Sequence, residues 1–287
     1  MHITLTDLTA DYPLGPTQST RVLQQINVKI QAGSYTAVIG HTGSGKSSLL
    51  KTINGLLLPT AGQIQIGQTV IAANQPIPPL TPLRRNVGMV FQFPEAQLFA
   101  ETVEADLCFG PLNFGMSERD AKVLAREAAA FVGLDEALLA KSPFTLSGGQ
   151  KRRAAIAGIL AMKPKVLLLD EPGAGLDPQG KKEIMELIAT LHRDRKLTIL
   201  LVTHDMNDAA QYADDIIIMN HGQLVLHEHT RNAFQDLDRL APWDIELPDA
   251  RKFQRQLEQT LGLTFANVCL TVEELANTMA EVRAYHE

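Results

Sequence analysis

The sequence is poor in cysteine and contains no long apolar run. Its two cysteines, Cys108 and Cys269, lie far apart and belong to no Cys-x-x-Cys pattern, which argues against a disulfide framework and fits a reducing compartment. No uninterrupted apolar stretch approaches the roughly 18 residues that a membrane span needs. The first residues lack the basic segment and apolar stretch of a secretory signal. We therefore expect that any membrane span used by this protein belongs to another chain.

Basic residues are not in excess either. The 287 residues include 26 Lys and Arg against 32 Asp and Glu, a net charge of −6, and the tail from Leu226 onward holds most of this negative charge. Such a tail is a poor candidate for binding nucleic acid or anionic lipid. The chain is long enough, and at 45% hydrophobic residues apolar enough, to fold as an α/β core with an appendage.

A phosphate-binding loop is the strongest signal that is present. Residues 40–47 match the pattern G-x-x-x-x-G-K-[ST]. Glycines let the backbone turn with positive φ, so that its N–H groups approach phosphate oxygens at a helix N-terminus. Lys46 supplies a positive charge for the β- and γ-phosphates, and the Ser47 hydroxyl is a Mg²⁺ ligand. We expect nucleotide contacts from Gly40, His41, Thr42, Gly43, Ser44, Gly45, Lys46, Ser47 and Ser48.

The sequence around this loop predicts an α/β core. Residues 35–39 form a β-rich run before it, and apolar residues at helical spacing follow it as far as Asn54. Two later runs, 166–169 and 198–202, are almost entirely apolar, which is typical of strands buried on both faces of a parallel sheet. An amphipathic helix around residues 184–191 lies between them. Strand–helix–strand units of this kind build doubly wound folds.

Three further regions complete the predicted organisation. Short strands before residue 39 and a hairpin at 64–71 predict antiparallel strands in the N-terminal part, followed by a Pro-rich loop at 75–82. The segment from about 94 to 162 lacks strand signals, so we expect a helical subdomain inserted into the sheet domain. Beyond a hairpin around 216–226, helical patches predict a small, mainly helical C-terminal domain, with a capping box at Thr271–Glu274.

Acidic residues and a histidine follow the two buried strands. Asp170 and Glu171 come at the end of the first, and His204 follows the second. The carboxyl ends of parallel strands meet at the edge where α/β sheets bind ligands. Asp170 suits Mg²⁺ beside Ser47, and Glu171 is placed to polarise an attacking water. We predict Glu171, His204 and Lys46 as the catalytic residues, with His204 contacting the γ-phosphate.

A second glycine-rich loop, at Ser147, Gly148, Gly149 and Gln150 after Leu146, opens another helix and is a second candidate anion site. One domain needs only one cradle for a γ-phosphate. This loop resembles the signature of the ATP-binding-cassette (ABC) ATPases, in which the signature of one subunit closes on ATP held by the phosphate loop of its partner. The resemblance implies an ABC ATPase fold, ATP and Mg²⁺ as ligands, and a dimer with two composite sites.

The other cassette elements occur in the family's order. Gln92 resembles the Q-loop glutamine, which contacts Mg²⁺ and water, so the implied metal ligands are Ser47, Gln92 and Asp170. Asp177, in Gly175-Leu176-Asp177, resembles the D-loop aspartate at the dimer interface, and His204 resembles the switch histidine. Tyr12 resembles the aromatic residue that stacks on adenine; the alternative is that Tyr12 only packs. The resemblance covers about residues 1–225.

The subfamily is indicated by the Phe-Pro-Glu version of the run 91–99 and by the run 142–153, which resemble the second ATPase of energy-coupling factor (ECF) vitamin transporters. The resemblance implies a motor subunit of an ECF-type importer of vitamins or other micronutrients, peripheral at the cytoplasmic face of the cell membrane. Implied partners are a homologous ATPase, a transmembrane coupling subunit and membrane-embedded substrate-binding subunits, with an ATP-binding domain at 1–228 and a dimerisation-type domain at 229–287. The sequence does not identify the transported substrate, and it leaves open whether the dimer is a heterodimer or a homodimer.

Two alternatives in function remain at this stage. One is the ATP subunit of another ABC importer, for cobalt, nickel or amino acids, and the other is a non-transport cassette protein. The second is disfavoured because the chain has one cassette, no heptad array and no basic stripe.

Two side-chain clusters have more than one interpretation. Phe91, Phe93, Leu98 and Phe99 near the Q-loop fit either a groove for a partner's helix or a core between subdomains. Histidines at 221, 227 and 229 invite a metal hypothesis, but a carboxylate or cysteine partner at suitable spacing is missing, so we do not expect a metal there.

Overall fold

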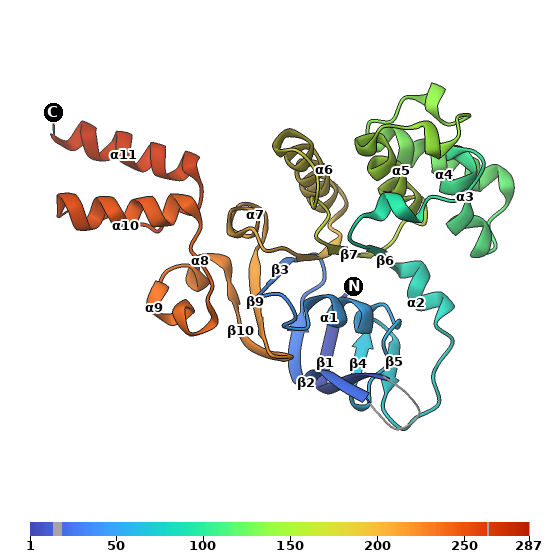
Figure 1. The fold of residues 1–287 in the computed structure, drawn as a ribbon, viewed down its shortest axis with the longest axis horizontal. Coiled ribbons are helices and arrows are strands. Elements are labelled where there is room, and N and C mark those ends of the chain that lie inside the picture. Colours follow the sequence, from blue (N-terminus) through green and yellow to red (C-terminus); the bar gives the residue numbers. More distant parts are fainter. Residues whose placement is uncertain (14–18, 263, 287) are drawn as a thin grey trace.

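The structure, a computed structural model, describes residues 1–13, 19–262 and 264–286 (Figure 1). Its strands are β1 (Ile3–Pro13), β2 (Ser19–Ile30), β3 (Tyr35–Ile39), β4 (Ala61–Ile66), β5 (Thr69–Ala72), β6 (Val87–Val90), β7 (Val166–Asp170), β8 (Thr198–Val202), β9 (Asp215–Asn220) and β10 (Gln223–His229). Its α-helices are α1 (Lys46–Ile53), α2 (Thr81–Asn86), α3 (Val103–Asn113), α4 (Glu118–Phe131), α5 (Gly148–Leu160), α6 (Pro178–Arg195), α7 (Met206–Tyr212), α8 (Thr230–Ala233), α9 (Leu237–Leu240), α10 (Asp249–Leu261) and α11 (Val272–His286).

The described strands form two sheets. A six-stranded sheet has the order β10-β9-β3-β8-β7-β6, in which all neighbours run parallel except β10, which pairs antiparallel with β9. A four-stranded antiparallel sheet has the order β2-β1-β4-β5. The expected parallel core and N-terminal antiparallel strands are confirmed. Residues 75–80 form the expected loop, whereas α2 already begins at Thr81.

Alternating side chains of the central strands face two different cores. On β7, Leu167 and Leu169 belong to the core beneath the helical segment and α6, whereas Val166 and Leu168 belong to the core shared with α1 and the antiparallel sheet. Both sets are fully buried, which explains why β7 is apolar at every position before Asp170. The polar residues that end β7 are thus held at one edge of a rigid sheet.

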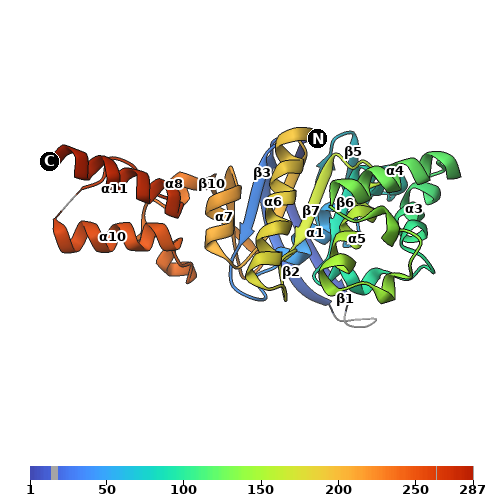
Figure 2. The ribbon, with the colours of Figure 1, turned by 90° about the horizontal axis from the view of Figure 1, so that it is seen from above.

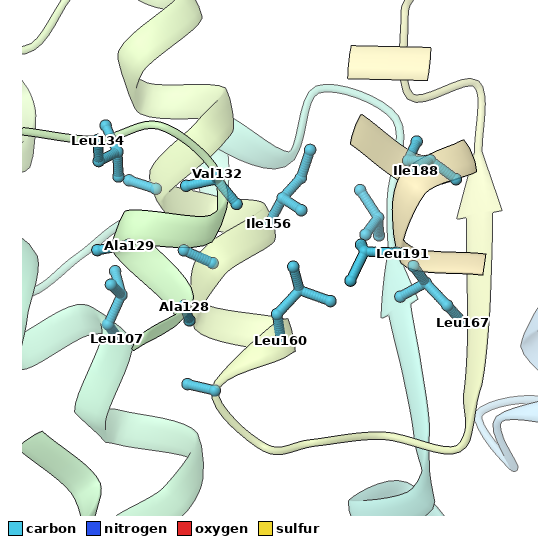
Figure 3. Close-up of a cluster of buried hydrophobic side chains, with 14 of the residues drawn as sticks. Leu107, Ala128, Ala129, Val132, Leu134, Ile156, Leu160, Leu167, Ile188 and Leu191 are labelled. Carbon is cyan, nitrogen blue, oxygen red and sulfur yellow. The ribbon is translucent and has the colours of Figure 1, made fainter. Parts of the chain in front are cut away.

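The helical segment packs tightly against the parallel sheet. Figure 3 shows one continuous cluster in which Ile156 and Leu160 of α5 lie between the helices α3 and α4 and the side chains of Leu167 on β7 and Leu191 on α6. Ser117 caps α4 by accepting a hydrogen bond from the backbone N–H of Asp120. The predicted helical content of residues 94–162 is confirmed.

The C-terminal part has two differently packed portions. Phe234, Leu240, Ile245 and Leu247 share a core with Ile216 and other residues of the parallel sheet. Helices α10 and α11 lie side by side beyond this core and project away from the sheets in both views (Figures 1 and 2). Across the described ranges, no helix combines the length and hydropathy that crossing a bilayer requires.

Candidate nucleotide-binding site

The loop between β3 and α1 adopts a conformation that only glycine tolerates. Gly40, Gly43 and Gly45 have φ values of 142°, 81° and 103°. A Cβ on Gly40 would lie 2.2 Å from the carbonyl oxygen of Met219, and one on Gly45 would lie 2.8 Å from that of Val22. A Cβ on Gly43 would meet no atom within 4 Å, so this glycine is needed for its backbone angle alone. The predicted spacing is therefore explained by geometry.

Lys46 closes the loop on itself. Its Nζ donates hydrogen bonds to the carbonyl oxygens of Gly40 at 2.7 Å and His41 at 2.9 Å. Burial lowers the pKa of Lys46 below its ordinary value, although the negative charges of Glu171 and Asp170 oppose this shift. An ammonium that is held at the loop by neutral carbonyls is well placed to exchange them for phosphate oxygens.

A hydroxyl and a carboxylate meet beneath the loop. The Ser47 hydroxyl donates to Asp170 Oδ1 at 3.0 Å. Burial raises the pKa of the Asp170 carboxyl, and the charge of Glu171 adds to this, whereas the hydrogen bond from Ser47 lowers it. Two oxygen ligands so close together, one of them a buried carboxylate, form a donor set that a hard divalent cation prefers.

Glu171 is the meeting point of two other predicted residues. The amide Nε2 of Gln92 donates to Glu171 Oε2 at 3.3 Å, and the Nδ1 atom of His204 lies 3.4 Å from Glu171 Oε1. Glu171 itself has φ = 49°, in the left-handed region, which costs a non-glycine residue roughly 1–2 kcal/mol. Backbone strain retained at such a position is typical of functional sites.

These residues line one open cavity of 1090 Å³. Every predicted residue of the phosphate loop lines it except Ser44, whose hydroxyl is buried below the loop without a hydrogen-bond partner among the described residues. The cavity wall also contains Val22 of β2 and further residues that sequence analysis did not find, from the turn after β8, the start of α7 and the C-terminal part. They are Asp205, Met206, Asn207, Asp244, Ile245, Glu246, Leu247, Asp249 and Lys252.

The signature loop lies outside this cavity. Ser147 and Gln150 form a complete capping box at the start of α5, since Ser147 Oγ accepts from the N–H of Gln150 and Gln150 Oε1 accepts from the N–H of Ser147. A Cβ on Gly148 or Gly149 would meet no atom of this chain within 4 Å. Nothing within the described part of the chain therefore requires glycine at these two positions.

Two other predicted residues also lie outside the cavity. Asp177 is the N-cap of α6, where its Oδ1 accepts from the N–H of Gly180 at 2.7 Å. Tyr12 lies near the end of β1, with the Nζ of Lys51 5.7 Å from the centre of its ring. Tyr12 is half-buried and packs against the core shared with α1 and the antiparallel sheet, so the structure shows its packing.

Of the apolar residues near Gln92, some belong to a core and others are exposed, so each of the two interpretations holds for part of the cluster. Leu98 is buried in the core beneath the helical segment and Phe91 packs against the core shared with α1, whereas Phe93 and Phe99 are 47% and 59% exposed. Phe99 stands edge-on to Phe109 with ring centroids 4.8 Å apart, and the two rings border a groove of 340 Å³ between α3 and α5. An apolar groove with two exposed aromatic rings on its rim is a candidate protein-binding surface.

Comparison with known proteins defines the family. The ABC transporter family matches residues 23–174. The chain is 55% identical to the energy-coupling factor transporter ATP-binding protein EcfA2 of Bacillus subtilis, over 91% of this chain and 94% of the relative. It is 53% identical to the EcfA2 protein of Geobacillus kaustophilus, over 91% and 90%. The chain belongs to the ABC transporter family.

Solved structures agree with this assignment. CbiO1 of Clostridium perfringens, part of the ABC transporter complex CbiONQ, has a TM-score of 0.70 at 34% identity, covering 91% of this chain and 95% of that one. The ATP-binding cassette MJ0796, in a dimeric post-hydrolysis state with ADP and Pi, has a TM-score of 0.70 at 30% identity, covering 80% and 99%. The chain is therefore a nucleotide-binding ABC ATPase of the energy-coupling factor type.

Proposed function

We propose that this chain is the motor subunit of an ECF-type importer, and that Glu171, Lys46 and His204 carry out its ATP hydrolysis. The observation that carries this proposal is the convergence of these three residues with Ser47, Asp170 and Gln92 on one cavity. Glu171 polarises the attacking water, because its carboxylate lies beside the phosphate loop and is oriented by Gln92. Lys46 and His204 contact the γ-phosphate, and Tyr12 stacks on the adenine.

Mg²⁺ fits the oxygen donors at this site. Ser47 Oγ and Asp170 Oδ1 are already in contact, and the side-chain oxygen of Gln92 belongs to the same cavity. When bound, Mg²⁺ neutralises developing phosphate charge. Asp170 accepts the hydrogen bond from Ser47 and thereby orients this hydroxyl, while Lys46 exchanges its contacts with the loop carbonyls for phosphate oxygens.

Two nucleotide sites are completed only in a dimer. The Gly148 and Gly149 backbone faces open space, and Ser147 and Gln150 cap the helix behind it, so the loop forms a preorganised anion site that lies away from this chain's own cavity. We propose that residues 147–150 and Asp177 close on ATP held by a second cassette. A homologous ATPase is the proposed partner, and the dimeric structure of the similar cassette MJ0796 supports this pairing.

The C-terminal region is proposed to contribute to the same pairing. Exposed apolar residues occur on both helices of the C-terminal hairpin: Phe253 and Leu261 on α10, and Val272 and Met279 on α11. We place the boundary between the ATP-binding domain, 1–228, and this dimerisation domain, 229–287, at the end of β10. Burial of these side chains against a second copy of the fold accounts for their exposure in the single chain.

The groove bordered by Phe99 and Phe109 is proposed to receive a helix of a transmembrane coupling subunit. Membrane-embedded substrate-binding subunits, and uptake of vitamins or other micronutrients, complete the proposal. The chain then lies peripherally on the cytoplasmic face of the cell membrane.

Affinity purification of the tagged chain from its own detergent-solubilised membranes tests this proposal. We expect a second, homologous cassette and a polytopic coupling subunit to purify with it. Recovery of the chain with itself and an ordinary pair of permeases would replace the ECF-type role with that of another ABC importer. Recovery with ribosomes or DNA would replace transport altogether.

A further inference from the structure

Arg152 is a charged side chain buried at the centre of the cassette. It lies in the first turns of α5, two residues after Gln150, and is only 2% exposed. A buried guanidinium requires partners for its charge and for its N–H groups, because desolvation is otherwise very unfavourable. The partners of Arg152 come from two loops that lie far from α5 in sequence.

The first partner is Glu95, in the short 3-10 turn Pro94–Gln97 that follows Gln92. Arg152 Nε donates to Glu95 Oε2 at 3.0 Å, and Nη2 donates to Glu95 Oε1 at 2.8 Å, so the pair is bidentate. Burial alone would raise the pKa of Glu95, but the bonds from Arg152 overcome this and hold it below its usual range. Glu95 is thus an ionised carboxylate that fixes the plane of the guanidinium.

The second set of partners lies directly after Glu171. The remaining nitrogen of Arg152, Nη1, donates to the carbonyl oxygen of Pro172 at 3.1 Å and to that of Ala174 at 2.7 Å. The N–H of Ala174 donates back to the carbonyl oxygen of Glu171 at 3.0 Å, which closes a turn. Through these two hydrogen bonds Arg152 stabilises the turn that begins at Glu171, where the backbone is left-handed.

We propose that Arg152 is a positioning residue for ATP hydrolysis, which holds the turn carrying Glu171 in place and is itself oriented by Glu95; this rests on the proposed role of Glu171. One planar side chain joins the signature helix, the segment after Gln92 and the turn after Glu171. Leu98 and Phe99 at the partner groove follow Glu95 by only a few residues. A shift of that segment is passed through Arg152 to Glu171, which links the groove to hydrolysis.

The test compares four variants in the complex purified through the tagged chain. Arg152→Lys keeps a charge opposite Glu95 but cannot make the fork and both carbonyl contacts. We expect its kcat to fall roughly 10- to 100-fold, the scale of a small misplacement, while KM and the Kd for ATP stay within about twofold. Glu95→Gln leaves the contacts from Arg152 to Pro172 and Ala174 in place, so we expect its kcat to fall as well, but by less than that of Arg152→Lys.

Two further variants serve as references. Glu127→Gln removes an exposed ion pair with Lys163 in the same subdomain, at 3.1 Å, and should leave kcat unchanged. Glu171→Gln reports on the proposed function itself. Suppose that Glu171→Gln is inactive, and that Arg152→Lys lowers the melting temperature but keeps a normal kcat per ATP-binding molecule. The positioning role of Arg152 is then overturned, while the proposed role of Glu171 stands. If Glu171→Gln turns over normally, the role of Glu171 fails, and the positioning role fails with it.

Discussion

Asn207 and Asp249 bond to each other twice across 42 residues of sequence. The Asn207 amide Nδ2 donates to Asp249 Oδ2 at 2.9 Å, and the Asp249 backbone N–H donates to Asn207 Oδ1 at 2.9 Å. Asn207 lies three residues after His204, and Asp249 is the first residue of α10. The start of α7, which borders the nucleotide cavity, is therefore joined directly to the start of the C-terminal helical hairpin.

Replacing Asn207 by alanine should weaken this junction. The substitution removes both side-chain contacts and frees the backbone N–H of Asp249, so we expect a loss of about 1–3 kcal/mol in the free energy of unfolding. Denaturant titration of the full chain measures this loss. Asn232→Ala, at an exposed position in α8, is the control and should change stability by less than about 0.5 kcal/mol. Equal stability of the two variants would show that the Asn207–Asp249 contact contributes nothing.

Two glycines of the phosphate loop should respond differently to the same change. Gly40→Ala places a Cβ 2.2 Å from the backbone oxygen of Met219, so the loop itself must move, and we expect about 3 kcal/mol or more of destabilisation. The new Cβ of Gly43→Ala lies in open space, so we expect only the cost of a non-glycine residue at φ = 81°, a destabilisation of about 1–2 kcal/mol. Thermal unfolding with and without ATP measures both. A larger loss for Gly43→Ala than for Gly40→Ala would contradict the steric argument.

Asp170→Asn should increase stability while it removes hydrolysis. Burial raises the pKa of Asp170, so the folded chain keeps this proton to a higher pH than the unfolded chain does. Stability therefore falls as pH rises through the ordinary range of an Asp carboxyl, and asparagine, which never ionises, escapes this loss. We expect Asp170→Asn to melt above the parent at neutral pH, with the difference shrinking in acid, and Mg²⁺-dependent hydrolysis to fall about 10²-fold or more.

Unfolding curves from pH 3 to 8 and steady-state ATPase assays check both parts of this prediction. Asp238→Asn, at an exposed position of α9, provides the control for removing one negative charge. A constant gap in melting temperature across the pH range would contradict the titration argument, since the gap would then have another cause.

A charge on the rim of the apolar groove should release the membrane partner. Phe99→Glu places a carboxylate where an exposed ring now stands, and we expect at least a tenfold smaller yield of the co-purified membrane subunit, with ATP binding retained. Val70→Glu, on β5 of the antiparallel sheet at 43% exposure, is the matched control. Equal loss for both variants would place the docking surface elsewhere.

The sequence predicted the parts of the site that follow a strand. Asp170, Glu171 and His204 come directly after apolar runs, and parallel strands bring such positions to one edge, so their meeting with the phosphate loop follows from the pattern. The helical content of residues 94–162 could also be predicted from the sequence, because an amphipathic helix begins after the capping residue Ser117.

The missed features depend on contacts between distant segments. Nothing in the local sequence of Arg152 distinguishes it from its less buried basic neighbours Lys151 and Arg153, and its partners lie 57 and about 20 residues away. The predicted capping box at Thr271 is only half present: Thr271 accepts from the N–H of Glu274, but the Glu274 carboxylate accepts from the N–H of Leu270 and pairs with Arg231 instead. Tertiary partners decide such details, and periodicity does not report them.

Glu171→Gln in the purified complex tests the central claim most directly. The amide keeps the size of the side chain but removes the charge that polarises water, so we expect ATP to bind with unchanged Kd while kcat falls on the order of 10²–10⁴-fold. Binding and single-turnover hydrolysis are measured on the same preparation. Turnover at the parent's rate would contradict the account, because the residue on which Gln92 and His204 converge would then take no part in the chemistry.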